Sequence, residues 1–165
     1  MIIDKAEWHY EDTEKLYRKM HDIKGELTKK QEEDVWLLAA NHIGLFMQWI
    51  VDHNFEGGES DKDECDKVRK RKISGAEYIM NNCDGKLWGG DIREDILPFV
   101  KVYYYDDGAR YLYHYTEICL DSIDKPCYSV LTSEKEYNKL KERMDMSYKN
   151  FLEGKEIKWK DCLEK

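Results

Sequence analysis

The histidine at position 42 is the side chain of this sequence best suited to chemistry, because an imidazole changes its charge near neutral pH. His42 lies within the apolar run of residues 35–51. A neutral ring among apolar residues needs a hydrogen-bond partner for its N–H group. The residue is therefore either a general base or ligand that faces a pocket, or a core histidine bonded to a carboxylate or a backbone carbonyl. We favour the core histidine.

The patterns that would indicate a metal site are missing. His53 falls on nearly the same helical face as His42, but eleven residues place the rings about 16 Å apart, so they cannot share an ion. The HExxH motif does not occur. The five cysteines are odd in number and form no CxxC pair, which disfavours both disulfides and a structural zinc site. No nucleotide-binding glycine motif or GxSxG motif occurs either. We expect no metal, no cofactor and no enzymatic activity.

Tyrosines are crowded between positions 103 and 115. Tyrosine offers rigid apolar area with a polar tip, which suits a layer between core and solvent, a protein interface or a stacking platform for a ligand. A nucleobase platform would also need basic neighbours, and only Lys101 and Arg110 are near. The boundary layer is the simplest interpretation, and an interface is the next. The tyrosines are Tyr103, Tyr104, Tyr105, Tyr111, Tyr113 and Tyr115.

A turn with the sequence Cys83-Asp84-Gly85-Lys86 follows a predicted helix. Gly85 suits the left-handed conformation that ends many helices. Asp84 and Lys86 are able to bind a polar ligand, but a structural helix stop is the better explanation of the turn. The Cys83 thiol lies near a helix C-terminus, without the positive field that activates a nucleophile.

Acidic residues outnumber basic ones in this chain of 165 residues, by 35 to 27, which gives a net charge of −8. Binding to nucleic acid requires a basic face, which this balance disfavours. The basic cluster at 67–72 follows an acidic run at 59–66, as in a solvated helix with opposite charges on neighbouring turns. A surplus of carboxylates is compatible with a basic protein partner.

Three capping boxes predict where helices begin. In each, a Thr or Ser is followed three residues later by Gln or Glu: Thr28 and Gln31, Ser74 and Glu77, Ser133 and Glu136. They predict a helix at about 29–54, one from residue 74 and one from residue 133 to about 154. The helix at 29–54 is apolar around most of its circumference, so it should be the central element. Shorter helices are expected at about 12–22 and 62–72.

Gly44 interrupts the central helix. A glycine in that position costs about 1 kcal/mol relative to alanine. We therefore expect a neighbouring backbone or a bulky ring to pack closely where its side chain would be.

The segment 96–118 fits two structures. Asp107-Gly108 between tyrosine-rich runs is typical of a hairpin over 99–115, which would make the protein α+β. Alternatively, Phe99 and Tyr103 share one helical stripe, and Tyr111 and Tyr115 form an i, i+4 pair. The residue pattern alone slightly favours the hairpin. Short strands are expected at 7–10 and 127–131.

A resemblance bears on this choice. The run of residues 40–49, which contains HIGLF and ends in Trp49, resembles the signature of an uncharacterised bacterial domain family. Three further parts are similar to that family: Trp8-His9-Tyr10, the CDGKL turn at 83–87, and the aromatic residues between 99 and 115. The resemblance spans about 8–151 and implies helices through 96–118, so we expect that segment to be helical. Tyr113-His114 departs from the family, which tends to have acidic residues there. The resemblance implies no activity.

Together these features predict a mainly α-helical protein with one or two short strands, and a single domain over residues 1–165. No signal peptide or membrane span is expected, and we expect a cytoplasmic protein. The leading hypothesis is a small acidic binding protein, of the bacterial immunity or antitoxin type, that blocks a basic toxin. The alternative is a small-ligand-binding protein or enzyme with a cleft around His42 and the 103–115 segment. The candidate binding residues are Trp8, His42, Trp49, Asp84, Lys86, Tyr103, Tyr104, Tyr111 and Tyr115.

Overall fold

The computed structural model describes residues 1–106, 110–120 and 126–157, and shows a mainly helical protein with one small sheet. The two strands are β1 (Ile2–Lys5) and β2 (Lys86–Trp88), which pair antiparallel. A 3-10 turn, η1 (Gly89–Asp91), and a π-helical turn, η2 (Lys101–Tyr105), accompany the α-helices. Those helices are α1 (Glu7–Met20), α2 (Lys29–Asp52), α3 (Lys62–Arg69), α4 (Gly75–Asn82), α5 (Leu97–Val100), α6 (Tyr111–Cys119) and α7 (Glu134–Leu152).

The three predicted capping boxes are confirmed. Thr28, Ser74 and Ser133 each accept a hydrogen bond from the backbone N–H three residues ahead, and the Gln or Glu side chain there bonds back to the cap. These contacts involve neighbours in sequence only, so the start of each helix could be predicted to within one residue.

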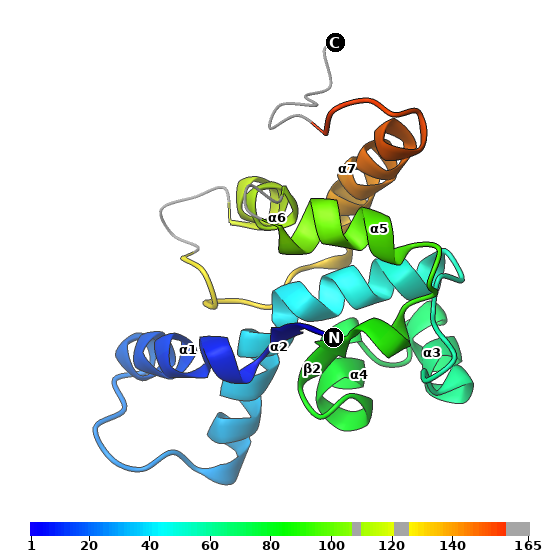
Figure 1. The fold of residues 1–165 in the computed structure, drawn as a ribbon. Coiled ribbons are helices and arrows are strands. Elements are labelled where there is room, and N and C mark those ends of the chain that lie inside the picture. The colour runs from blue at the N-terminus through cyan, green and yellow to red at the C-terminus, as the bar shows by residue number, and fades with distance from the viewer. Residues whose placement is uncertain (107–109, 121–125, 158–165) are drawn as a thin grey trace.

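Helix α2 is the central element, as expected. It lies between α5 and α6 on one side and α4 and β2 on the other (Figure 1). Every residue from Leu38 to Val51 is buried, which explains why its sequence is apolar around most of the helix. Phe46 and Trp49 are fully buried and contact the rings of Tyr104 and Phe99 from the opposing helices.

The predicted close packing at Gly44 is confirmed. A Cβ atom there would lie 2.2 Å from the backbone nitrogen of Ala76 in α4. The approach is mutual, because a Cβ on Gly75 would lie 1.9 Å from the carbonyl oxygen of Gly44. Helices α2 and α4 thus touch backbone to backbone, which offsets the low helix propensity of Gly44.

Residues 97–105 and 111–119 are helical, so the hairpin over 99–115 was the wrong alternative. Phe99 and Tyr103 are buried in α5 and η2, and Tyr111 and Tyr115 are buried in α6. Helical spacing turns each pair toward the core, whereas a strand would turn its alternate residues to solvent. The Asp107-Gly108 pair lies outside the described residues.

The strands expected at 7–10 and 127–131 were wrong. Residues 7–10 form the first turn of α1, since Thr13 and Tyr17 continue a helical stripe toward the core. Residues 127–131 form turns and bends, and most of them are exposed. Neither segment has a partner strand within the described part of the chain, and without one a strand's backbone groups cannot pair. The actual strands are only four and three residues long.

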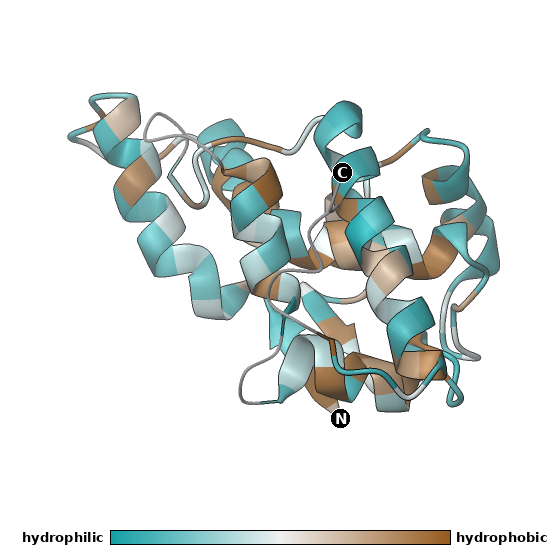
Figure 2. Cartoon of the chain, turned by 90° about the horizontal axis from the view of Figure 1, so that it is seen from above, coloured by the Kyte–Doolittle hydropathy of each residue, from teal (hydrophilic) through white to brown (hydrophobic). Residues whose placement is uncertain are grey.

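Charged residues cover the outer faces of the helices, and Figure 2 shows hydrophilic colour over much of each of them. On α3 the basic cluster is matched by carboxylates: Lys67 pairs with Glu64, and Arg69 pairs with Asp66 and Glu56. This is the alternation that the sequence indicated. Within the described residues, no helix has both the length and the apolarity needed to cross a membrane.

Candidate functional site

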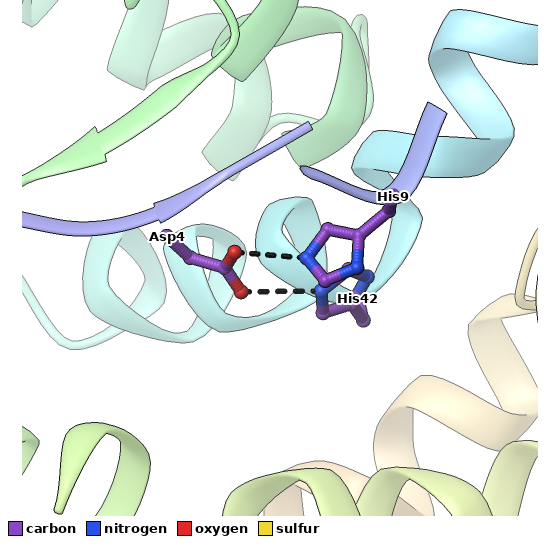
Figure 3. Close-up of side chains that lie close together, drawn as sticks. All are labelled: Asp4, His9 and His42. Carbon is purple, nitrogen blue, oxygen red and sulfur yellow. Dashed lines mark hydrogen bonds and ion pairs between the residues drawn. The ribbon is translucent and has the colours of Figure 1, made fainter. Parts of the chain in front are cut away.

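One carboxylate and two imidazoles from three different elements converge in the protein. Nε2 of His9 lies 2.9 Å from Oδ1 of Asp4, and Nε2 of His42 lies 3.2 Å from Oδ2 of the same carboxylate (Figure 3). The two imidazole rings pack edge to face, with centroids 4.5 Å apart. Asp4 and His42 are buried, and the His9 side chain is 21% exposed. We call these three residues the Asp–His–His cluster.

The local chain path explains how Asp4 and His9 come together. Strand β1 ends at Lys5 and α1 begins at Glu7, so the chain turns sharply within two residues. The backbone N–H of Ala6 donates to the carbonyl of Gly85 and fixes that turn against the end of α4. The first turn of α1 then brings the ring of His9 beside the carboxylate of Asp4 and against the ring of His42 in the central helix (Figure 3).

Two tyrosines from distant parts of the chain hold the cluster in place. The hydroxyl of Tyr104 donates to Oδ2 of Asp4 at 2.7 Å, and the backbone N–H of Lys5 donates to Oδ1 at the same distance. The hydroxyl of Tyr128 lies 2.9 Å from Nδ1 of His9. Tyr128 has a φ of +66°, a left-handed conformation that is costly for a large side chain.

The charges in the cluster follow from burial and pairing. Burial opposes ionisation of Asp4, but hydrogen bonds from His42 and His9 outweigh it and hold the pKa of this carboxyl well below its ordinary value. Burial lowers the pKa of His42 despite the neighbouring carboxylate, so the ring is neutral at pH 7. Burial raises the pKa of Tyr128 to about 12, which keeps its hydroxyl protonated. The cluster therefore combines an ionised carboxylate with a neutral imidazole.

A second feature lies on the surface, where the loop after α2 meets the segment between β2 and α5. Here a broad hollow of about 1020 Å³ is lined by four carboxylates and one arginine, Arg93. The side chains of Trp88 and Leu97 supply apolar area. The carboxylates are Glu56, Glu59, Glu94 and Asp95. We call this hollow the acidic groove.

Backbone contacts fix the walls of the acidic groove. Gly57 donates its N–H to the carbonyl of Asp91 at 2.8 Å, and a Cβ on Gly57 would lie 2.2 Å from the carbonyl oxygen of Gly90. The carboxylate of Glu59 rests on Gly90, where a Cβ would meet it at 2.2 Å. Gly57 is needed for this close approach, because the atoms it meets belong to the backbone, whereas at Gly90 the flexible side chain of Glu59 could shift.

A family model matches residues 2–130, which include the whole Asp–His–His cluster and the acidic groove. The chain belongs to DUF7832, a domain family of unknown function. The expectation of an uncharacterised domain family is thus confirmed. Comparison with the curated proteins and with the solved structures finds no match. The DUF7832 match ends before α7, which nevertheless packs against α6 and α2.

Four candidate binding residues of this DUF7832 protein lie around the cluster. His42 belongs to it and Tyr104 donates to it, while Tyr111 donates to the backbone carbonyl of His42. The ring of Tyr115 lies 5.9 Å from that of His42, and its hydroxyl accepts a hydrogen bond from Asn41. All four are buried, so they form a closed polar centre rather than an open cleft.

The other candidate residues lie elsewhere. Trp49 is fully buried and donates from Nε1 to Asp145 at 2.7 Å, and Tyr103 is buried against His114. Trp8 is 59% exposed at the start of α1. Asp84 and Lys86 pair with each other in the turn after α4. There Asp84 and Gly85 both have positive φ, as expected of a helix stop.

Sequence reasoning missed the partners of His42. It expected a carboxylate or a carbonyl beside this ring, and Asp4 is that carboxylate, 38 positions away. Asp4, His9 and Tyr128 were not among the candidate binding residues. The available signal was the Trp8-His9-Tyr10 run that resembles the family, which singled out the neighbourhood of His9 but not its role. The acidic groove had no sequence signal beyond the abundance of acidic residues.

Proposed function

We propose that this protein is a small acidic binding protein that inhibits a basic protein by direct contact, in the manner of a bacterial immunity protein or antitoxin acting in the cytoplasm. The observation that carries the proposal is the acidic groove. Its lining carries four carboxylates against Arg93 alone, and it includes Trp88, which is 40% exposed.

The pairing of these charges leaves part of the acidic groove available to a partner. Glu56 pairs with Arg69, and Asp95 pairs with Arg93. Glu59 and Glu94 have no ion pair with a basic side chain in the part of the chain that the structure describes. A lysine or arginine of a partner would find two carboxylates here and an indole face for its aliphatic stem. The fit favours a basic protein over an anionic ligand such as nucleic acid.

The alternative function, small-ligand binding or catalysis around His42 and the tyrosines, is supported by a different observation. The Asp–His–His cluster gathers ionisable groups in one place, as active sites do. Against this, Tyr103 and Tyr111 are fully buried, and His42 is 2% exposed. A substrate would therefore have to open the core before it reached these groups. We place this function second.

A charge-reversal experiment tests the binding proposal. We expect Glu59→Lys/Glu94→Lys to abolish binding of an oligo-arginine peptide, measured by NMR through the shift of the Trp88 indole resonance. The matched control, Glu26→Lys/Glu33→Lys, makes the same change in net charge at exposed sites outside the acidic groove. Binding to wild type should weaken as salt increases, because the Debye length falls from about 10 Å at 0.1 M to about 3 Å at 1 M.

The inhibitory role needs its own test. Wild type and both double variants are immobilised and exposed to host extract. Wild type and the control variant should retain one basic protein that the groove variant, Glu59→Lys/Glu94→Lys, does not retain. Expression of that protein alone should arrest growth, and coexpression with this chain should restore it. Equal loss of peptide binding in both double variants would refute the groove as the binding site. A captured protein without effect on growth would refute the immunity role.

A further inference from the structure

We propose that Asp4, His9 and His42 form a binding site for a divalent transition-metal ion such as Zn²⁺, in which two imidazole nitrogens and one carboxylate oxygen are the protein ligands. The sequence led us to expect no metal, because it shows no ligand spacing typical of one. The structure brings the ligands together from a strand and two helices instead. This site is separate from the acidic groove and does not depend on the proposed binding function.

The distances fit such an ion. Three potential ligand atoms, one from each residue, lie within 4.8 Å of one another. Nε2 of His9 lies 2.9 Å from Oδ1 of Asp4, and Nε2 of His42 lies 3.2 Å from the other carboxylate oxygen, Oδ2. Zinc bonds of 2.0–2.1 Å in a tetrahedral site separate neighbouring ligand atoms by about 3.3 Å. Two histidines and one carboxylate are also a donor set that zinc and iron use in proteins.

The surroundings resemble the outer contacts of metal sites, where ligands are themselves hydrogen-bonded. Tyr128 contacts the nitrogen of His9 that faces away from Asp4, and Tyr104 bonds to the carboxylate. Partners of this kind orient ligands and tune their basicity. The unfavourable φ of Tyr128 indicates that the fold holds this tyrosine in place at some expense.

The chain contains a matched control for this site. His53 is 24% exposed in its side chain and pairs with Asp145 at 2.9 Å, much as His9 is 21% exposed and pairs with Asp4 at 2.9 Å. Among the described residues, the His53–Asp145 pair has no second histidine beside it that would complete a three-ligand group. Replacement of His9 should therefore weaken metal binding by the cluster, whereas replacement of His53 should not.

The test is a titration of the purified full-length protein with Zn²⁺, followed by calorimetry, and with Co²⁺, followed by visible absorption. We expect one Zn²⁺ per chain and the d–d bands of Co²⁺ bound in a low-symmetry site. His9→Ala should weaken Zn²⁺ binding at least tenfold and remove the Co²⁺ bands, whereas His53→Ala should change neither. Tyr128→Phe should weaken binding about tenfold, as loss of an outer contact does.

His9 is the first residue to replace because it is the most exposed of the three ligands, so its substitution should leave the fold intact. Circular dichroism and the melting temperature check this. Absence of Zn²⁺ binding by the wild type would overturn the proposal and leave the cluster as a hydrogen-bonded network. Binding that is equally strong in His9→Ala, or lost equally in His53→Ala, would show adventitious surface sites and would also overturn it.

Discussion

At the scale of single residues, carboxylates with little solvent exposure join distant segments of this protein. Asp52, at the end of α2, accepts both guanidinium nitrogens of Arg71 at 2.7 and 2.8 Å and the hydroxyl of Tyr137 at 2.7 Å. Burial opposes ionisation of Asp52, but the bonds from Arg71 and Tyr137 prevail and lower its pKa. The stabilisation from this carboxylate is therefore complete above its ordinary pKa of about 3.9 and is lost as the pH falls through the lowered value.

We expect Asp52→Asn to reduce the free energy of unfolding by about 2 kcal/mol at pH 7, because hydrogen bonds to a charged group are lost. We do not expect a larger loss, because the Arg71 side chain is 36% exposed and solvent screens its pairing with Asp52. The difference from wild type should shrink as the pH falls below about 3.9 and on through the lowered pKa of the wild-type carboxyl. Urea unfolding at several pH values between 7 and 2.5 measures this difference in the free energy of unfolding. Asp12→Asn, at an exposed site in α1, should show no such pH dependence, and a constant difference for Asp52→Asn would contradict the linkage.

At the scale of elements, the contact between α2 and α4 depends on two glycines. Because the Cβ of an alanine at position 44 would overlap the backbone of Gly75 and Ala76, Gly44→Ala should force the helices apart. We expect a loss of about 3 kcal/mol in the free energy of unfolding, at the upper end for overpacking. Chemical denaturation measures this loss. Gly25→Ala, where a Cβ would meet nothing within 4 Å, should change stability little. Unchanged or raised stability of Gly44→Ala would show that helix propensity, not contact, governs position 44.

The same scale shows what the sequence could predict. Capping boxes and apolar stripes involve residues a few positions apart, so α2, α4 and α7 were predicted nearly to their ends. Strands depend on a partner elsewhere in the chain. The pairing of β1 with β2 joins residues more than 80 positions apart, and no local pattern indicates it. The candidate site was hidden for the same reason, since Asp4 and His42 meet only after β1 has docked.

At the scale of the whole molecule, α7 completes a core that the DUF7832 region leaves open. Trp49 of α2 donates to Asp145 of α7, and Leu140 and Met144 are fully buried. Residues beyond 130 therefore pack into the same hydrophobic core as residues 2–130, and we expect the two parts to unfold together. A buried leucine in α7 should then support the stability of the entire chain, including the cluster around Asp4.

The helix provides its own comparison, because Leu140 is fully buried and Leu152 is 65% exposed. Leu140→Ala should lower the free energy of unfolding by about 3 kcal/mol, through lost burial and a new cavity. Leu152→Ala should change it by less than about 0.5 kcal/mol. Unfolding followed by tryptophan fluorescence and by circular dichroism should give one coincident transition for both variants. Two separate transitions in Leu140→Ala would mean that α7 unfolds on its own, and that the domain over residues 2–130 is stable without it.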